Sequence, residues 1–172
     1  MGPSLIFSLV VIAVALPWES PGGETNKEKT MNIDLSRAVT GGLVGTAVMT
    51  MVGLFAAPMM GSLPMNPAEL LAGAMGGNLV LGWGGHLMIG MVLALSYAVV
   101  GSLLPGPGIA RGVIYSIAPF LMAQLLVMPM MGMPFFSGSA SMAMGTLVGH
   151  LVYGAILGQI YGEVGVTQVT TG

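Results

Sequence analysis

The chain has 172 residues, of which 55% are hydrophobic and only 6% are charged, with a formal net charge of -2 at pH 7. A soluble globule of this size needs more polar side chains to cover its surface, so the composition predicts an integral membrane protein in a lipid bilayer. The sequence has no cysteine, which excludes disulfides, thiolate metal sites and iron–sulfur clusters. The small net charge on scattered residues argues against nucleic acid as a partner.

The first 30 residues are expected to form an N-terminal extension outside the core. Their apolar run, residues 5–16, is short for a membrane helix, and the polar stretch 19–29 separates it from the next apolar segment. The run has the length of a signal-peptide core but lacks a basic segment before it and a clear small-residue cleavage site. Three alternatives stay open for this extension: it is cleaved, weakly ordered or a short apolar helix. Residues 31–172 are predicted to form a single membrane domain.

Four apolar stretches follow, each about as long as the 20 residues that a hydrocarbon core requires. They cover residues 38–60, 79–103, 112–131 and 142–162, and none has a charged side chain well inside it. The predicted fold class is therefore all-α, a polytopic membrane four-helix bundle. Between the first two spans, Asn66-Pro67-Ala68-Glu69 has the residue order of a helix start and predicts a short helix over 67–75.

The basic residues indicate the orientation in the membrane. Lys27, Lys29 and Arg37 precede the first span and Arg111 lies between the second and third, so all four fall on one side of the predicted bundle. The positive-inside rule assigns this side to the cytoplasm. We therefore predict a multi-pass protein of the inner (plasma) membrane whose four-helix core has cytoplasmic N- and C-termini.

The core also carries signs of an internal duplication. The pair Gly85-His86, with Tyr97 further on, returns 64 positions later as Gly149-His150 with Tyr161. Two further motifs recur upstream with offsets of 71 and 74 positions: Pro58-Met59-Met60-Gly61 as Pro129-Met130-Met131-Gly132, and Arg37-Ala38-Val39 as Arg111-Gly112-Val113. These matches predict two tandem helical hairpins, over about residues 36–104 and about residues 110–165, with loops of different length.

The chain's two histidines each lie in a ridge of small residues with four-residue spacing, as found where membrane helices pack closely. If the halves are related by an axis along the membrane normal, the two imidazoles face the same space between helices at matching depth. The residues predicted to mediate helix packing are Gly82, Gly90, Gly154, Gly158 and Gly162.

Three interpretations of His86 and His150 stay open. In the first, each imidazole forms a hydrogen bond across a helix interface, to a backbone carbonyl or to Tyr97, Tyr161, Thr146 or Gln124. In the second, the two rings are the axial ligands of a b-type haem. In the third, they bind copper(I) together with thioethers from the outer loops; the methionines on that side are Met59, Met60, Met65, Met128, Met130, Met131 and Met133.

The core resembles a family of small, uncharacterised four-helix integral membrane proteins of bacteria and archaea, over about residues 31–162. Four stretches carry the resemblance: Gly41-Gly42-Leu43-Val44-Gly45-Thr46, Gly85-His86 with Tyr97, Arg111-Gly112, and Gly149-His150-Leu151-Val152-Tyr153-Gly154-Ala155-Ile156-Leu157-Gly158 with Tyr161. The resemblance implies a place beside respiratory electron transfer, because some members of that family are encoded near oxidase components. It implies no activity, and the methionine content of this chain is not part of the family's pattern.

A non-catalytic role is predicted, because the sequence has no paired carboxylates in a span, no glycine-rich phosphate loop and no Ser-His-Asp arrangement with a buried acid. We predict an accessory or structural subunit of a membrane complex, which the resemblance implies to be respiratory, with other membrane subunits or further copies of itself as partners. The alternatives are a bis-histidine haem-b electron carrier and a small transporter or channel. Transport is disfavoured because ion pathways usually place charged residues within the spans.

Overall fold

The computed structural model describes residues 33–162, all of which belong to one compact unit, Lys29–Gln168. The predicted extension over residues 1–30 lies outside the described residues. Within the described part of the chain the secondary structure is helical, and no strand occurs there.

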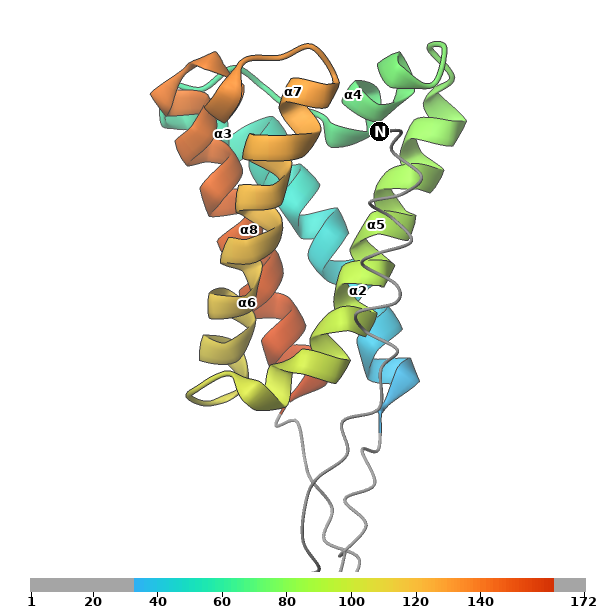
Figure 1. Ribbon diagram of the computed structural model, residues 1–172, viewed down its shortest axis with the longest axis vertical. Helices are drawn as coiled ribbons and strands as arrows, with labels where there is room; N and C mark the ends of the chain where they lie inside the picture. The colour runs from blue at the N-terminus through green and yellow to red at the C-terminus, as the bar shows by residue number, and fades with distance from the viewer. Residues whose placement is uncertain (1–32, 163–172) are drawn as a thin grey trace, which may run out of the picture. The chain divides into compact units, whose positions relative to one another are not determined.

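Four helical segments are long and apolar enough to cross a membrane, which confirms the predicted helical membrane bundle. They cover Leu35–Met59, Leu79–Leu103, Gly108–Met130 and Ala140–Tyr161. Figure 1 shows that the first and third spans run in one direction and the second and fourth in the other. The arrangement agrees with two successive hairpins.

Polar caps place the helix starts a few residues before the apolar stretches begin. Helix α2 (Leu35–Met51) begins after Asp34, whose carboxylate accepts the N–H of Arg37 at 2.9 Å. Helix α8 (Ala140–Tyr161) begins after Ser139, whose hydroxyl accepts the N–H of Met142 at 3.3 Å. These side chains satisfy N–H groups that the first turn of a helix leaves without a partner.

The predicted short helix between the first two spans is confirmed as α4 (Pro67–Ala74). The Asn66 side chain accepts the N–H of Ala68 at 3.0 Å, and its amide donates to Glu69 at 3.1 Å. Proline is suited to the first helical position because the N–H that it lacks has no partner there in any case.

The first and third spans share the same irregularity near their ends. In the first, α2 passes into a π-helical segment, Val52–Ala56, and then into the short α3, Ala57–Met59. In the third, α6 (Gly108–Met122) passes into the π-helical segment Ala123–Val127 and then into α7, Met128–Met130. Each short last turn contains a proline, which has no N–H to donate to the preceding turn.

The connection that follows each of these spans folds back onto its π-helical segment. The N–H of Met65 donates to the carbonyl of Gly53 at 3.1 Å, and the hydroxyl of Ser137 donates to Oε1 of Gln124 at 3.0 Å. Gly53 and Gln124 are 71 positions apart, the same offset that relates the two Pro-Met-Met-Gly motifs. A duplicated hairpin predicts such a correspondence, and the duplication itself stays a hypothesis.

The contacts between neighbouring spans are unequal. Helices α2 and α8 pack against each other, α5 (Leu79–Val100) packs on α2, and α6 packs on α8. Helices α5 and α6 meet over a shorter stretch, where the hydroxyl of Tyr115 on α6 donates to the carbonyl of Leu93 on α5 at 2.8 Å. Helix α4 covers the adjoining end of α5. The ribbons of α5 and α6 diverge towards the loops that carry α4, as Figure 1 shows.

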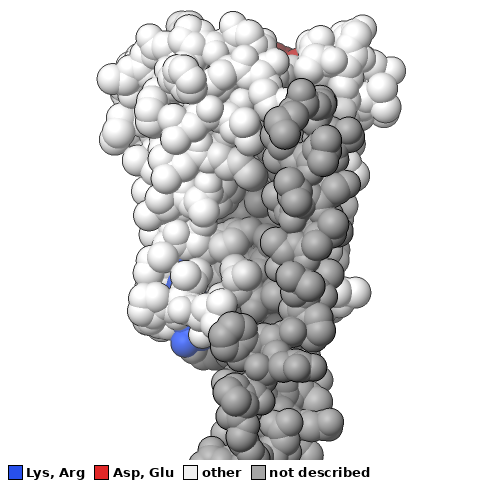
Figure 2. All heavy atoms as spheres, in the orientation of Figure 1, with Lys and Arg blue, Asp and Glu red and all other residues white. Residues whose placement is uncertain are grey.

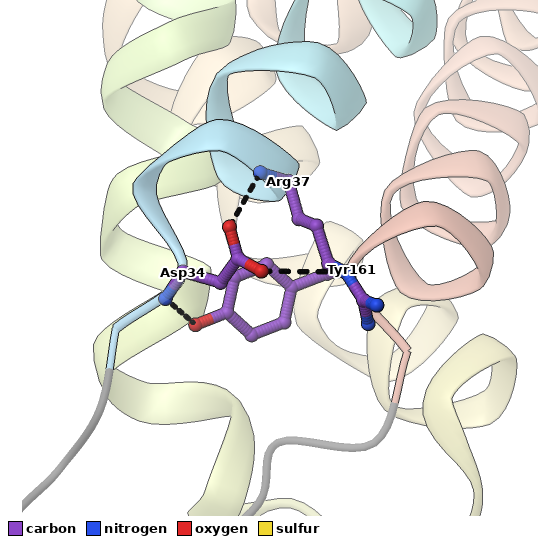
Figure 3. A network of polar contacts seen from close by, with 3 residues as sticks. All are labelled: Asp34, Arg37 and Tyr161. Carbon is purple, nitrogen blue, oxygen red and sulfur yellow. Dashed lines mark hydrogen bonds and ion pairs between the residues drawn. The ribbon is translucent and has the colours of Figure 1, made fainter.

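One end of the bundle, which we call the basic end, holds Arg37 and Arg111 at the starts of α2 and α6. Figure 3 shows the contacts that join α2 to the end of α8 there. Nε of Arg37 lies 3.3 Å from the carboxylate of Asp34, and the Asp34 N–H donates to the hydroxyl of Tyr161 at 3.3 Å. The opposite end, which we call the loop end, carries α4 and the short helical turn Phe135–Gly138.

Charged side chains of the described residues are confined to these two ends. Asp34, Arg37 and Arg111 lie at the basic end and Glu69 lies at the loop end. Figure 2 shows blue atoms only near the bottom, red atoms only near the top, and no coloured atoms on the white surface between them. An uncharged belt of this kind is what contact with lipid acyl chains requires.

Candidate functional site

A cavity of about 160 Å³ lies in the loop-end half of the bundle, and both histidines line it. All four spans contribute to its wall, together with α4 and the connection before it. It opens between α5 and α6, where Ile89 and Met122 line the cavity and are also 44% and 48% exposed. Nearly all of the lining is apolar, so the imidazoles are its main polar groups.

His86 comes from α5 and is held by the facing helix α2. Its Nε2 lies 3.0 Å from the hydroxyl oxygen of Thr50, and that hydroxyl lies 2.9 Å from the carbonyl of Thr46. Because a carbonyl only accepts, Thr50 donates to Thr46 and accepts from the Nε2–H of His86. This arrangement leaves Nδ1 of His86 with a lone pair.

His150 comes from α8 and is held by its own helix. Its Nδ1 lies 2.9 Å from the carbonyl oxygen of Thr146, one turn earlier. The carbonyl can only accept, so Nδ1 carries the proton and Nε2 keeps a lone pair. The ring of Phe120 on α6 packs edge-on against the imidazole, with centroids 5.7 Å apart, and fixes its orientation.

The partners of the two imidazoles differ in part from those predicted. Thr146 accepts from His150 through its backbone, but within α8 and not across a helix interface as predicted. Thr50 does lie across an interface from His86, but it was not among the predicted partners. Gln124 instead accepts from Ser137. The signal for Thr50 was present in the sequence, because Thr46 and Thr50 lie on one face of the first span, and both are 1–2% exposed.

The predicted packing glycines lie at close helix contacts, with one exception. A Cβ on Gly90 would overlap the side chain of Thr46 on α2, and one on Gly154 or Gly158 would overlap backbone carbonyls of α6. Gly82 packs against α4 and not against another span, since its Cβ would overlap the carbonyl of Ala68. Gly162 lies one residue past α8 with a φ of 75°, so it terminates the helix and does not pack two spans together.

The methionines divide into two groups. Of those predicted to accompany the histidines, Met65, Met128 and Met131 line the cavity, whereas Met59 and Met130 are 87% and 78% exposed. Sequence analysis missed three further methionines in the lining, which are Met49, Met122 and Met142. They lie within the spans, where a methionine in the sequence looks like any other apolar residue.

The cavity does not fit a b-type haem. Its volume of about 160 Å³ is close to the roughly 150 Å³ of a protein cavity that accommodates benzene, which is far smaller than a porphyrin. A haem would require the side chains around the cavity to move apart.

The helices and the cavity together define a small polytopic membrane protein with a mostly apolar cavity that both histidines line. A family model matches residues 33–170, and the chain belongs to that family, which is described as Family of unknown function (DUF6789). No curated protein and no solved structure matches the chain. Membership agrees with the uncharacterised family that the sequence resembles, and it assigns no activity.

Proposed function

We propose that this protein is a non-catalytic membrane protein that binds a small ligand in the cavity between His86 and His150. The observation that carries this proposal is that the only two histidines of the chain line one cavity within the apolar part of the bundle. Ionisable side chains are costly at this depth and usually mark a functional site in membrane proteins.

The hydrogen bonds of the two rings support binding. Nε2 of His150 and Nδ1 of His86 each keep a lone pair, because the other nitrogen of each ring is the one that donates to the protein. Both residues line the cavity, so the site has two ring nitrogens that can accept a hydrogen bond or bind a metal within mostly apolar walls.

The packing around the cavity favours entry from the side rather than passage through the bundle. Ile89 and Met122 form an exposed mouth between α5 and α6. Towards the basic end, the core is filled by Tyr97 and Leu157, both 0% exposed, and by Tyr153, whose hydroxyl donates to the carbonyl of Gly90 at 2.6 Å. A channel would need an open path past these side chains.

The test compares two alanine-to-leucine variants of the full chain. Ala123 lines the cavity, so Ala123→Leu is expected to fill it, whereas Ala47 is exposed on α2 and Ala47→Leu is the matched control. Each protein is purified from its native membrane in mild detergent, and its bound species are identified by native mass spectrometry and elemental analysis. We expect a bound species in the wild type and in Ala47→Leu and its loss in Ala123→Leu. The proposal would be contradicted if none of the three proteins carried a bound species, or if all three carried the same one.

A second candidate function is that of an accessory subunit of a membrane complex, for which a respiratory complex is the first to examine. It is supported by the side between α5 and α6, where the apolar side chains of Ile89 and Met122 are exposed at the mouth of the cavity. A photo-reactive residue at Met122, on this side, is expected to cross-link one partner in native membranes, whereas the same residue at Leu43 on α2 is expected to cross-link lipid only. Equal protein cross-linking at both positions would argue against a specific partner at this side.

A further inference from the structure

The lining of the cavity is unusually rich in sulfur. Six of the chain's 17 methionines line it: Met49, Met65, Met122, Met128, Met131 and Met142. Methionine is a common adaptable filler of apolar space, so number alone does not define a metal site. The positions of particular sulfur and nitrogen atoms are needed.

The side chain of Met65 is fixed in the cavity by its backbone. The N–H of Met65 donates to the carbonyl of Gly53 at 3.1 Å, within the π-helical segment of the first span. A Cβ on Gly53 would lie 2.7 Å from the carbonyl oxygen of Met65, so this close approach requires glycine. The loop is thereby held against the span, with its methionine in the cavity wall.

Thr146 brings the sulfur of Met65 and the imidazole of His150 into one neighbourhood. Sδ of Met65 lies 3.9 Å from the hydroxyl oxygen of Thr146, while the carbonyl of the same residue accepts Nδ1–H of His150. The Thr146 hydroxyl also lies 2.9 Å from the carbonyl of Met142, which is the stronger acceptor. The lone pairs of the sulfur and of Nε2 therefore both stay available.

A second sulfur-bearing side chain lies against the residue that precedes the same histidine. Cγ of Met49 would be 3.4 Å from a Cβ on Gly149, and Cε would be 3.9 Å from it. Met49 thus covers the residue that directly precedes His150. Met49 and His150 both line the cavity, so this thioether belongs to the same wall as the imidazole.

The chemistry of these groups selects among metal ions. Thioether and imidazole are soft and intermediate ligands, and such ligands favour Cu(I). Divalent ions are more costly to transfer into an apolar cavity than a monovalent ion, and no carboxylate lines the cavity to offset that cost. No group of three His, Cys, Asp or Glu side chains suited to a metal occurs within residues 33–162, which argues against zinc, calcium and magnesium there.

We infer that the cavity binds one Cu(I) ion between Nε2 of His150 and Sδ of Met65, with Met49 as a further thioether in the cavity wall. This inference rests on the proposed function and names the ligand of the same site. The ion enters as Cu(I), so binding needs no oxidation or reduction at the site. The imidazole and the thioethers are neutral ligands, so binding releases no proton.

The test is a competition for Cu(I), kept reduced by ascorbate, between the purified full-length protein in detergent and the chromogenic chelator bicinchoninate. Met65→Leu removes the sulfur at nearly constant volume, and Met59→Leu makes the same change at a residue that is 87% exposed. We expect one Cu(I) per chain in the wild type and in Met59→Leu. Because changes around metal sites typically weaken binding about 10- to 100-fold, Met65→Leu is expected to weaken it by about tenfold or more.

A second measurement separates loss of binding from loss of fold. A metal ion that binds the native state raises the midpoint of thermal unfolding. Saturating Cu(I) should therefore raise this midpoint in the wild type and in Met59→Leu, but much less in Met65→Leu. Without metal, the midpoint of Met65→Leu should equal that of the wild type. No Cu(I) retained by the wild type, or equal affinities for both variants, would overturn the inference. If native mass spectrometry then finds a different molecule that is bound in the wild type and absent from Ala123→Leu, the proposed ligand-binding function is supported and only the inference of copper is overturned.

Discussion

The hydroxyl of Thr50 on α2 holds the imidazole of His86 on α5, at 3.0 Å between Oγ1 and Nε2. Because the same hydroxyl donates to the carbonyl of Thr46, it presents only an acceptor to the ring. One threonine therefore both positions the side chain and determines which ring nitrogen carries the proton.

Replacement of Thr50 by valine tests this relationship. Thr50→Val keeps the shape of the side chain but removes the acceptor, so a buried Nε2–H is left without its partner, and we expect a loss of about 1 to 2 kcal/mol in the free energy of unfolding. Unfolding in detergent measured by circular dichroism provides the value. Thr50→Ser keeps the hydroxyl and is expected to lose less; equal losses in the two variants would show that the hydrogen bond adds little.

Glycine substitutions test the close packing of α6 on α8. A Cβ on Gly154 would overlap the carbonyl of Gly112, so Gly154→Ala must push the two helices apart and is expected to cost about 1 to 3 kcal/mol. Gly84 on α5 has open space at this position. Gly84→Ala is therefore expected to be neutral or to stabilise the protein by up to about 1 kcal/mol, through helix propensity.

Both glycine variants can be measured by the same unfolding experiment in detergent. The expected result is a difference of opposite sign relative to the wild type. A Gly154→Ala protein as stable as the wild type would mean that α6 and α8 do not approach as closely as the structure indicates.

Gln124 offers a test of an unsatisfied polar group in the membrane. Its Oε1 accepts from Ser137, but its Nε2 is buried and has no hydrogen-bond partner among the described residues. Gln124→Leu removes the hydrogen bond from Ser137, which destabilises the protein, and it also removes the unsatisfied buried donor, which stabilises it. The two effects oppose each other, so the free energy of unfolding is expected to change by less than about 1 kcal/mol. Gln124→Glu puts a charge at the same depth and is expected to cost about 3 kcal/mol. A large loss in the leucine variant would indicate a partner for Nε2.

The parts of the fold that follow from local chemistry could be predicted from the sequence. The spans follow from hydrophobic length, and α4 follows from Asn66 and Pro67, whose capping roles need no tertiary contact. Both histidines line one cavity, and their equivalent places in the two halves of the sequence had led us to expect that they face the same space.

Features that depend on contacts between distant segments could not be predicted. The π-helical segments are local in sequence, but each is bonded by a loop that comes later in the chain and folds back, as Met65 does on the carbonyl of Gly53. Nor does a sequence show which methionines turn inward, since Met59 is exposed and Met65 lines the cavity only a few residues later. The identity of the ligand depends on such positions, which explains why sequence reasoning left three interpretations open.

The orientation of the bundle in the membrane is a further prediction, which rests on the two arginines at the basic end. Arg37 and Arg111 lie at the starts of α2 and α6, on the same end as Leu103, whereas Ala74 lies at the end of α4. The positive-inside rule places the arginine end in the cytoplasm. The native chain has no cysteine, so single cysteines can be labelled without background.

We expect a membrane-impermeant maleimide to label Ala74→Cys in cells whose inner membrane is intact and to label Leu103→Cys only after that membrane is permeabilised. Both side chains are exposed, so accessibility to the reagent depends on the side of the membrane and not on burial in the protein. Val92→Cys, at a position that is 58% exposed in the middle of α5, is the control for the lipid belt. It should resist labelling from either side, because lipid acyl chains exclude the charged reagent and keep the thiol protonated. Labelling of Leu103→Cys before permeabilisation would reverse the orientation, and labelling of Val92→Cys by the same reagent would place α5 against water instead of lipid.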